Sequence, residues 1–264
     1  MKVSTIKKIA LVAIVFVLLL CGAYIARKAY NKIINMEQRN NTSIALVRET
    51  MEMQQECSLD SLPHNVLCIG NSITLHQPLD RVNWYSRNGM AASKPEFDYC
   101  HVLESKLKKL NNKSSVTPVD VASWERDFNA SLDSLLHDVI QDKDIIVIRL
   151  GENVDGDNIN KFSKELPRLI EYCQQYSKHI VITGLYWSHL QKEMAIVENA
   201  KNFKLKYVPI DWIWDLYKEE CSPKEGDTLY DTNGKQYQIK GNFITKHPND
   251  KGMEMIADCI YNAL

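Results

Sequence analysis

The chain has 264 residues, of which 45% are hydrophobic and 25% are charged, and its formal net charge is −1. This composition is typical of a globular protein, and the balanced charge gives no reason to expect nucleic-acid binding. The roughly 200 residues that follow the N-terminal region are enough for one domain with one large core.

The first predicted element is an apolar segment at residues 9–26, 18 residues without a charged side chain. As a helix it would be about 27 Å long, close to the hydrocarbon thickness of a bilayer. We predict a transmembrane signal anchor here, after a basic start at residues 1–8; a cleaved signal peptide and a buried core helix are the alternatives. The basic start favours an extracytoplasmic domain on a membrane-anchored protein, although basic residues on both sides leave the orientation open.

Residues 27–62 are polar, with apolar residues at roughly helical spacing, and predict a helical stalk before a single domain at residues 63–264. Within this domain, apolar runs alternate with amphipathic segments, which indicates a parallel sheet covered by helices on both faces. The predicted strands are residues 66–69, 119–122, 144–150, 180–186 and 207–210. The predicted helices are residues 97–110, 131–140, 159–176, 189–203 and 250–264. Residues 221–243 predict a surface loop or small hairpin near the site.

The seven cysteines lack the spacing of a metal site, and their number is odd. Cys68 and Cys259 fall at predicted core positions, so we expect most cysteines to be small buried hydrophobic residues. The sequence contains no HExxH motif, no phosphate-binding glycine-rich loop and no convincing carboxylate cluster for two metals. We therefore expect no metal and no cofactor, and a phosphatase or nuclease is disfavoured.

A serine and a histidine at opposite ends of the domain carry the functional hypothesis. Gly70-Asn71-Ser72 follows the first predicted strand, and a lone His247 precedes Pro-Asn and the last predicted helix. Ligands of open α/β sheets bind outside the carboxyl ends of the strands, where Ser72 is expected to lie. Ser72 and His247 can therefore form a nucleophile and its base. The alternatives are a helix N-cap for Ser72 and a surface-loop position for His247.

Two further polar blocks follow predicted strands: Ala-Ser-Trp-Glu-Arg-Asp at residues 122–127 and Gly-Glu-Asn at residues 151–153. The four blocks, in this order, resemble the SGNH hydrolase superfamily, also called GDSL-like esterases and lipases, over about residues 63–264. The resemblance implies that Ser72 is the nucleophile and His247 the base. It also implies that the Asn153 side chain and the Ser72 backbone N–H donate to the oxyanion, although Asn153 can equally be a turn residue. Gly151, Glu125 and Asn71 are the expected supporting residues.

The chain departs from the family pattern at three places. Asn71 stands where the family usually has Asp, and the second block has no glycine to offer a backbone N–H. Glu125 can then point into the site, or it is a solvated charge at a helix start. Ile244 lies three residues before His247, where the family usually carries the Asp that orients the imidazole. Three possibilities follow: a backbone carbonyl orients the His247 ring, a distant acid orients it, or the domain is catalytically impaired. The candidate distant acids are Asp211, Asp231 and Glu125.

Residues between and around the blocks offer weaker expectations. Residues 89–93, Gly-Met-Ala-Ala-Ser, are expected to form a wall of the site, and His76 either faces the pocket or is a partly exposed helix residue. Four tryptophans lie near strand ends, where they can contact a sugar ring or an acyl chain or simply pack in the core and rim. They are Trp124, Trp187, Trp212 and Trp214.

These features together predict a flavodoxin-like three-layer α/β/α sandwich of about five parallel strands, in which Ser72, Asn153 and His247 converge at the carboxyl edge. The predicted function is a serine esterase that removes a small acyl group, such as acetyl, from a carbohydrate or cell-envelope glycan through an acyl-enzyme on Ser72. An acyltransferase with the same chemistry is one alternative. A non-catalytic glycan-binding or scaffold domain without the triad acid is the other. The sequence does not specify an oligomeric state.

Overall fold

The computed structural model describes Leu62 and residues 64–264. The predicted basic start, membrane anchor and nearly all of the predicted stalk, residues 1–61, lie outside the described residues. In the part of the chain that the structure describes, none of the helices has the length and apolar character needed to cross a membrane. Anchoring and the extracytoplasmic location therefore stay predictions.

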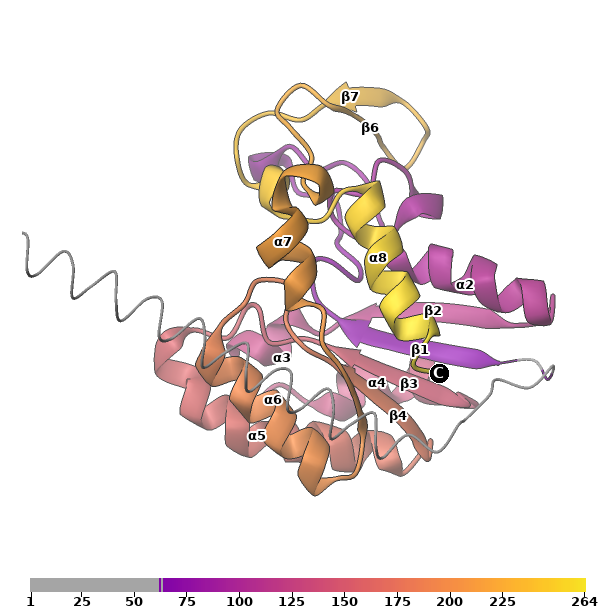
Figure 1. Ribbon diagram of the computed structural model, residues 1–264, viewed down its shortest axis with the longest axis vertical. Coiled ribbons are helices and arrows are strands. Elements are labelled where there is room, and N and C mark those ends of the chain that lie inside the picture. Colours follow the sequence, from indigo (N-terminus) through magenta and orange to yellow (C-terminus); the bar gives the residue numbers. More distant parts are fainter. Residues whose placement is uncertain (1–61, 63) are drawn as a thin grey trace, which may run out of the picture. The chain divides into compact units, whose positions relative to one another are not determined.

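The centre of the domain is a five-stranded sheet in the order β2-β1-β3-β4-β5, and every neighbouring pair is parallel. The strands are β1 (Asn65–Gly70), β2 (Ser115–Asp120), β3 (Ile145–Arg149), β4 (His179–Thr183) and β5 (Lys206–Val208). This order is that of flavodoxin-like doubly wound sheets, whose ligands bind beyond the carboxyl ends of the strands. The predicted α/β class with five parallel strands is thus confirmed (Figure 1).

Helices cover both faces of the sheet, as Figure 1 shows. On one face α2 (Tyr99–Leu110) packs against α8 (Asp250–Tyr261), and on the other α5 (Ile159–Gln174) packs against α6 (Leu190–Asn202). The remaining helices are α3 (Ala122–Arg126), α4 (Leu132–Ile140) and α7 (Asp211–Cys221), with short 3₁₀ turns at Asp80–Val82, Pro95–Phe97, Gly156–Asn158 and Ile244–Lys246. Asp98, Ser131 and Asn249 cap α2, α4 and α8 by accepting backbone N–H groups.

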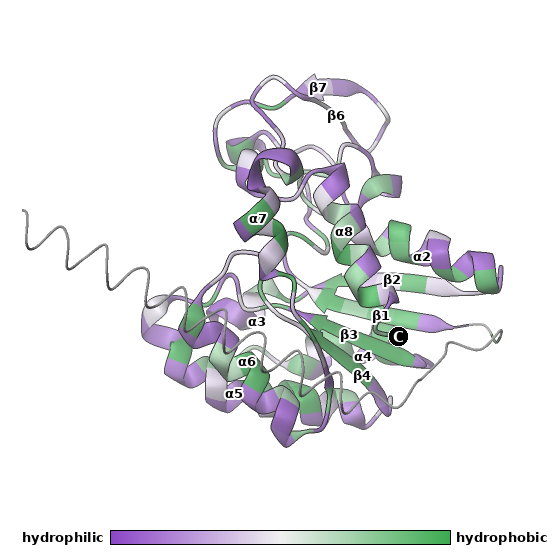
Figure 2. Cartoon of the chain, in the orientation of Figure 1, coloured by the Kyte–Doolittle hydropathy of each residue, from purple (hydrophilic) through white to green (hydrophobic). Residues whose placement is uncertain are grey.

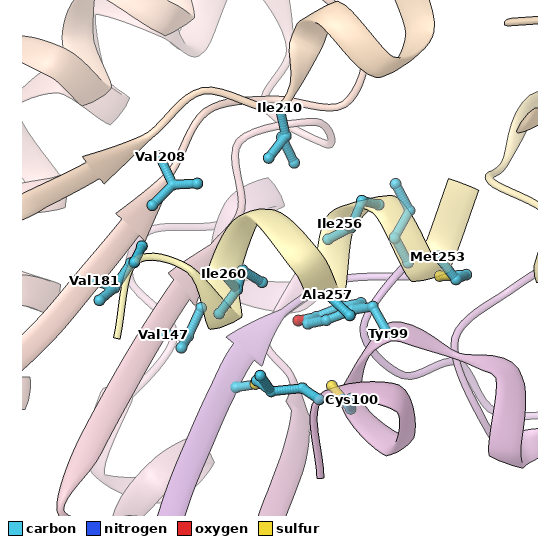
Figure 3. Packing of buried hydrophobic residues seen from close by; sticks show 14 of the residues in the cluster. Tyr99, Cys100, Val147, Val181, Val208, Ile210, Met253, Ile256, Ala257 and Ile260 are labelled. Carbon is cyan, nitrogen blue, oxygen red and sulfur yellow. The ribbon is translucent and has the colours of Figure 1, made fainter. Parts of the chain in front are cut away.

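The core between the sheet and α8 is built from β-branched strand residues and aliphatic helix residues. Val147, Val181 and Val208 come from three neighbouring strands and pack in one cluster with Ile256 and Ile260 of α8 (Figure 3). Strands β1 and β3 are hydrophobic along most of their length, as Figure 2 shows, because helices cover them on both faces. This packing holds the carboxyl ends of β1 and β3 in fixed positions.

The segment before His247 is held by a second, smaller core. Strands β6 (Thr228–Tyr230) and β7 (Gln236–Gln238) form an antiparallel hairpin, so the predicted small hairpin is confirmed. Leu229 of β6 and Ile239, which directly follows β7, are buried with Ile244 and with Trp84 from the segment after β1. The chain therefore approaches His247 through an anchored element rather than a free loop.

The structure corrects several predicted boundaries. Strand β2 begins at Ser115, four residues before the predicted start, and ends at Asp120. It contains Pro118, which an edge strand tolerates because its outer side needs no ladder hydrogen bond. Strand β4 ends at Thr183, three residues before the predicted end. Helix α7 was not predicted. Only two of its residues, Ile213 and Cys221, are buried, so its apolar periodicity is weak.

Candidate active site

Ser72 lies in a tight turn directly after β1. The backbone N–H groups of Thr74 and Leu75 donate to the Asn71 carbonyl at 2.7 and 3.0 Å. Gly70 permits this turn, since a Cβ there would lie 2.7 Å from the Arg149 carbonyl oxygen and would overlap the Thr74 side chain. No helix follows Ser72 before the turn at Asp80–Val82, so the alternative of a helix N-cap is wrong.

His247 approaches Ser72 from the opposite end of the chain. Its Nε2 lies 3.0 Å from Ser72 Oγ, and its Nδ1 lies 3.2 Å from the backbone carbonyl oxygen of Phe243. The carbonyl can only accept, so the proton is on Nδ1 and the Nε2 lone pair is available to the Ser72 hydroxyl. The imidazole is thus oriented by a main-chain carbonyl, the first of the three possibilities left open by the missing Asp. The candidate distant acids bond to other groups: Asp211 to the Trp212 N–H, Asp231 to the Asn233 N–H and Glu125 to Asn153 Nδ2.

The surroundings of His247 are apolar and keep its ring neutral. The side chain is buried, with the Trp187 ring edge-on at 5.2 Å and the Phe243 ring at 5.5 Å between centroids. Burial lowers the pKa of His247 to about 4, and the Phe243 carbonyl offsets only part of this effect. The Trp187 indole N–H donates to the Lys246 carbonyl at 3.0 Å, which fixes the indole beside the imidazole. The His247 imidazole is therefore unprotonated at neutral pH, with Nε2 free to accept a hydrogen bond.

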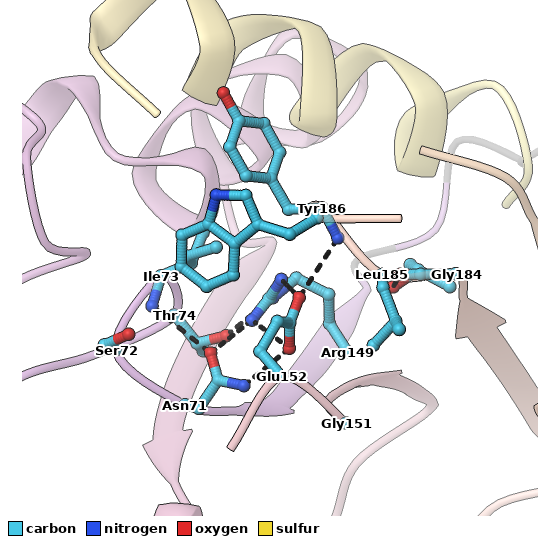
Figure 4. A network of polar contacts seen from close by, with 12 residues as sticks. Asn71, Ser72, Ile73, Thr74, Arg149, Gly151, Glu152, Gly184, Leu185 and Tyr186 are labelled. Atoms are coloured by element: carbon cyan, nitrogen blue, oxygen red, sulfur yellow. Dashed lines mark hydrogen bonds and ion pairs between the residues drawn. The ribbon is translucent and has the colours of Figure 1, made fainter. Parts of the chain in front are cut away.

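A buried polar network lies beneath Ser72 (Figure 4). Asn71 Nδ2 donates to Glu152 Oε2 at 2.6 Å, and the Arg149 guanidinium donates to Glu152 Oε1 at 2.7 Å and to Asn71 Oδ1. The Tyr186 backbone N–H also donates to Glu152, at 3.1 Å. Burial raises the pKa of Glu152, but the Arg149 charge and the hydrogen bonds that the carboxylate accepts together outweigh burial, and the pKa is lowered. The network therefore holds an ion pair against the residue that precedes the serine.

Glu125 at the end of the second block extends this network. Its side chain is fully buried and accepts hydrogen bonds from Asn71 Nδ2 at 3.1 Å, the Gly151 N–H at 2.5 Å and Asn153 Nδ2 at 2.8 Å. Burial and the neighbouring Glu152 charge raise the pKa of Glu125. The alternative of a solvated charge at a helix start is wrong. Three sequence blocks, represented by Asn71, Glu125 and Asn153, thus meet at one place.

Other residues singled out by the sequence have different environments. His76 lies in no helix; it pairs with Asn88 in an isolated bridge, and its Nδ1 is 2.6 Å from the Gln77 carbonyl. Residues 89–93 pack behind the serine, with the Met90 N–H donating to the Ser72 carbonyl at 2.7 Å. Trp124 is fully buried, which favours core packing for this residue. Trp212 and Trp214 are partly buried against the core beneath α7.

Two contributors to the site were missed by the sequence analysis. Arg149 is a fully buried cation at the end of β3, and its signal was a charge within the apolar run Asp-Ile-Ile-Val-Ile-Arg-Leu. The backbone carbonyl of Phe243 could not be recognised from the sequence, since every residue carries such a group. In the part of the chain that the structure describes, His, Cys, Asp and Glu side chains form no group of three or more that could hold a metal ion.

Comparison with known proteins supplies a fold but no family. No family model matches the chain, and no curated protein matches its sequence. Among solved structures, LAE5, an α/β hydrolase enzyme from the metagenome of Lake Arreo in Spain, aligns with a TM-score of 0.54 at 14% identity, over 77% of this chain and 96% of that one. The psychrotrophic esterase EstA from Pseudoalteromonas sp. aligns with a TM-score of 0.50 at 14% identity, over 76% and 96%. Axe2, an acetylxylan esterase from Geobacillus stearothermophilus, aligns with a TM-score of 0.48 at 14% identity, over 76% and 93%. The first two alignments show that the domain has the fold of these solved hydrolases.

Proposed function

We propose that the domain is a serine hydrolase that cleaves carboxylic esters. The observation that carries the proposal is the contact of 3.0 Å between Ser72 Oγ and His247 Nε2, with Nδ1 held by the Phe243 carbonyl. A hydroxyl beside the lone pair of an oriented, neutral imidazole is the arrangement required for an activated nucleophile. The hydrogen bond between His247 Nδ1 and the Phe243 carbonyl counts against the alternative of a non-catalytic scaffold. A scaffold of that kind would be expected to leave the His247 ring without a partner at Nδ1.

The reaction would proceed in two steps. Ser72 Oγ attacks the ester carbonyl carbon while its proton passes to His247 Nε2, and the resulting imidazolium then gives this proton to the departing alcohol oxygen. This leaves the acyl group on Ser72. In the second step His247 takes a proton from water, the hydroxide oxygen attacks the acyl carbon, and Ser72 Oγ leaves with the proton from His247. The products are one carboxylic acid and one alcohol.

Two groups are proposed to stabilise the oxyanion. The backbone N–H of Ser72 donates to none of the residues that the structure describes, so it is available to a substrate oxygen. Asn153 Nδ2 carries two hydrogens, and Glu125 takes one of them at 2.8 Å. Removing a single donor of this kind lowers kcat by about 100- to 1,000-fold in other enzymes.

The proposed substrate is a small acyl ester of a carbohydrate. Phe243 is 48% exposed and its ring contacts His247, so an aromatic surface reaches solvent beside the base. Trp187 adds a second ring, edge-on to the imidazole at 5.2 Å between centroids. Flat apolar rings suit contact with a sugar ring. Together with the apolar segment at residues 9–26, this makes an acylated cell-envelope glycan the proposed substrate of a membrane-anchored enzyme.

The first test is hydrolysis of p-nitrophenyl acetate by the purified protein. Ser72→Ala and His247→Ala should each lower kcat by at least about 1,000-fold, because each removes half of the nucleophile–base pair. Ser134→Ala is the matched control, since Ser134 is an exposed serine of α4, and it should leave the rate unchanged. Equal rates for the wild type and Ser72→Ala would refute the proposed function.

A second test addresses the acyl group. The proposal expects the wild type to release acetate from acetylated oligosaccharides and to lose kcat/KM as the acyl chain of p-nitrophenyl esters lengthens from acetate to octanoate. A rising kcat/KM along this series would contradict the small-acyl assignment and leave the ester hydrolase intact.

A further inference from the structure

The side chain of Glu125 joins the three segments that follow β1, β2 and β3. Its Oε1 accepts from Asn71 Nδ2 at 3.1 Å, from the Gly151 N–H at 2.5 Å and from the Asn153 N–H at 3.4 Å. Its Oε2 accepts from Asn153 Nδ2 at 2.8 Å. The side chain is fully buried, so water does not replace these contacts. Asn71 directly precedes Ser72, and Asn153 is therefore linked to the nucleophile's turn through a single carboxylate.

A carboxylate determines how the Asn153 amide is turned. An ionised carboxylate only accepts hydrogen bonds, whereas an amide presents a donor on one side and an acceptor on the other. With Oε2 of Glu125 as the neighbour, Asn153 must direct Nδ2 toward it, and Oδ1 then faces the Arg126 guanidinium at 3.5 Å. Turning the amide over would set its oxygen against the carboxylate and its nitrogen against a cation. One orientation of Asn153 is thus selected by charges on both sides.

The charges around Glu125 are balanced. Glu152 lies nearby and shares Asn71 Nδ2 with it, while Arg149 pairs with Glu152. Lys192 reaches the same place and donates to the Gly151 and Glu152 carbonyls at 3.1 and 3.2 Å. Two acids and two cations therefore meet in a buried volume. A carboxylate on Glu125 does not leave the site with an excess of negative charge next to a developing oxyanion.

We propose that Glu125 is a positioning residue, which holds the Asn153 amide with an N–H directed at the oxyanion beside Ser72. This inference rests on the proposed ester hydrolysis and identifies what determines the efficiency of that site. Glu125 touches no reacting atom and acts only through Asn153. It stands in the second sequence block, at the place where the chain lacks a glycine donor.

Replacing one carboxylate oxygen of Glu125 by an NH2 group is expected to reverse the preferred orientation of the Asn153 amide. In Glu125→Gln the side chain keeps its shape and Oε1 can still accept, but Nε2 replaces the acceptor that Asn153 Nδ2 requires. The Asn153 amide then gains a hydrogen bond by turning over, which directs its nitrogen to the place that Oδ1 occupied beside Arg126 and away from the oxyanion. The double variant Glu125→Gln/Asn153→Asp restores a donor–acceptor pair between the two positions but supplies no N–H to the oxyanion.

The test measures kcat and KM for p-nitrophenyl acetate with the full-length protein and its variants. We expect Asn153→Ala to lower kcat by about 100-fold or more and Glu125→Gln by at least about 30-fold, with KM changed by less than about 3-fold. Because Glu125 acts through Asn153, adding Glu125→Gln to Asn153→Ala should cost no more than about a further 3-fold. Glu193→Gln is the control: it replaces another carboxyl group, one that is partly buried and bonded to Tyr207 and to the Leu185 N–H, and it should change kcat by less than about 3-fold.

Three results would overturn the inference. They are a Glu125→Gln enzyme within about 3-fold of the wild type, losses that multiply in the double variant with Asn153→Ala, and recovery of kcat in Glu125→Gln/Asn153→Asp. The last of these would show that the hydrogen bond serves only to hold the fold. This paired variant also keeps the test informative if Glu125→Gln alone unfolds. If the wild type is no faster than Ser72→Ala, the proposed function itself fails and the inference fails with it; loss of the inference alone requires Ser72-dependent activity.

Discussion

The proposed base, His247, is expected to titrate well below the ordinary range of imidazoles. Burial lowers the pKa of His247 to about 4, and its Nδ1 partner is the neutral Phe243 carbonyl rather than a carboxylate that would favour the imidazolium. At pH 5 a histidine of pKa about 4 is about 90% neutral, whereas one of pKa about 6.5 is about 3% neutral. The fraction of active base at this pH therefore differs by about 30-fold between the two cases.

The lowered pKa of His247 also makes the free energy of unfolding depend on pH. Between about pH 6.5 and about pH 4 the unfolded chain protonates this histidine while the folded protein does not, so the free energy of unfolding decreases as the pH falls through this window. The decrease from His247 alone amounts to about 3 kcal/mol, since one pKa unit corresponds to about 1.4 kcal/mol. Above about pH 6.5 the contribution is complete.

The assay is an NMR titration of the histidine ring protons, in which the His247 signal is assigned by its absence from His247→Gln. The expected midpoint is close to 4. A midpoint at or above about 6.5 would refute the reasoning, because it would require either solvent at the ring or a carboxylate partner that the structure does not place there.

Three further predictions concern the residues that hold the site. Trp187→Ala should open one side of the His247 ring to water and raise its pKa toward about 6.5, which the same titration detects; an unchanged midpoint would mean that the indole does not shield the ring. Arg149→Met should lower the free energy of unfolding by about 3–5 kcal/mol, because it leaves the buried Glu152 carboxylate unpaired, and a loss below about 1 kcal/mol in urea denaturation would contradict this. Gly70→Ala should lower it by at least about 1–3 kcal/mol, since the added Cβ meets the Arg149 carbonyl oxygen at 2.7 Å; a thermal midpoint equal to the wild type would show that the turn can move.

The sheet was predictable from the sequence because its strands are apolar on both faces. β3 and β4 stand out as runs of Ile and Val, and the helices between strands have clear apolar faces, as in α5. The predicted start of the edge strand β2 lay too far along the chain, since half-buried residues and Pro118 weaken its apolar pattern. Helix α7 was missed for a related reason, because few of its residues enter the core.

The candidate site was predictable only where side-chain identity carries the signal. Ser72 and His247 were selected because a serine at a strand end and a lone histidine before the last helix are chemically distinctive. The role of the Phe243 carbonyl depends on the path of the chain through Ile244–Lys246, which no residue type specifies. The environment of Glu125 depends on three segments that meet only after the sheet has formed, so the sequence alone left its position open.

The most direct test of the account is covalent capture of the nucleophile. The purified protein is incubated with a p-nitrophenyl alkylphosphonate, and the adduct is located by mass spectrometry of the digested chain. The account expects one adduct, on the Ser72 peptide, that is absent from Ser72→Ala and forms at least about 100-fold more slowly in His247→Ala. An adduct at another residue, or one that forms equally fast without His247, would contradict the claim that these two residues act as nucleophile and base.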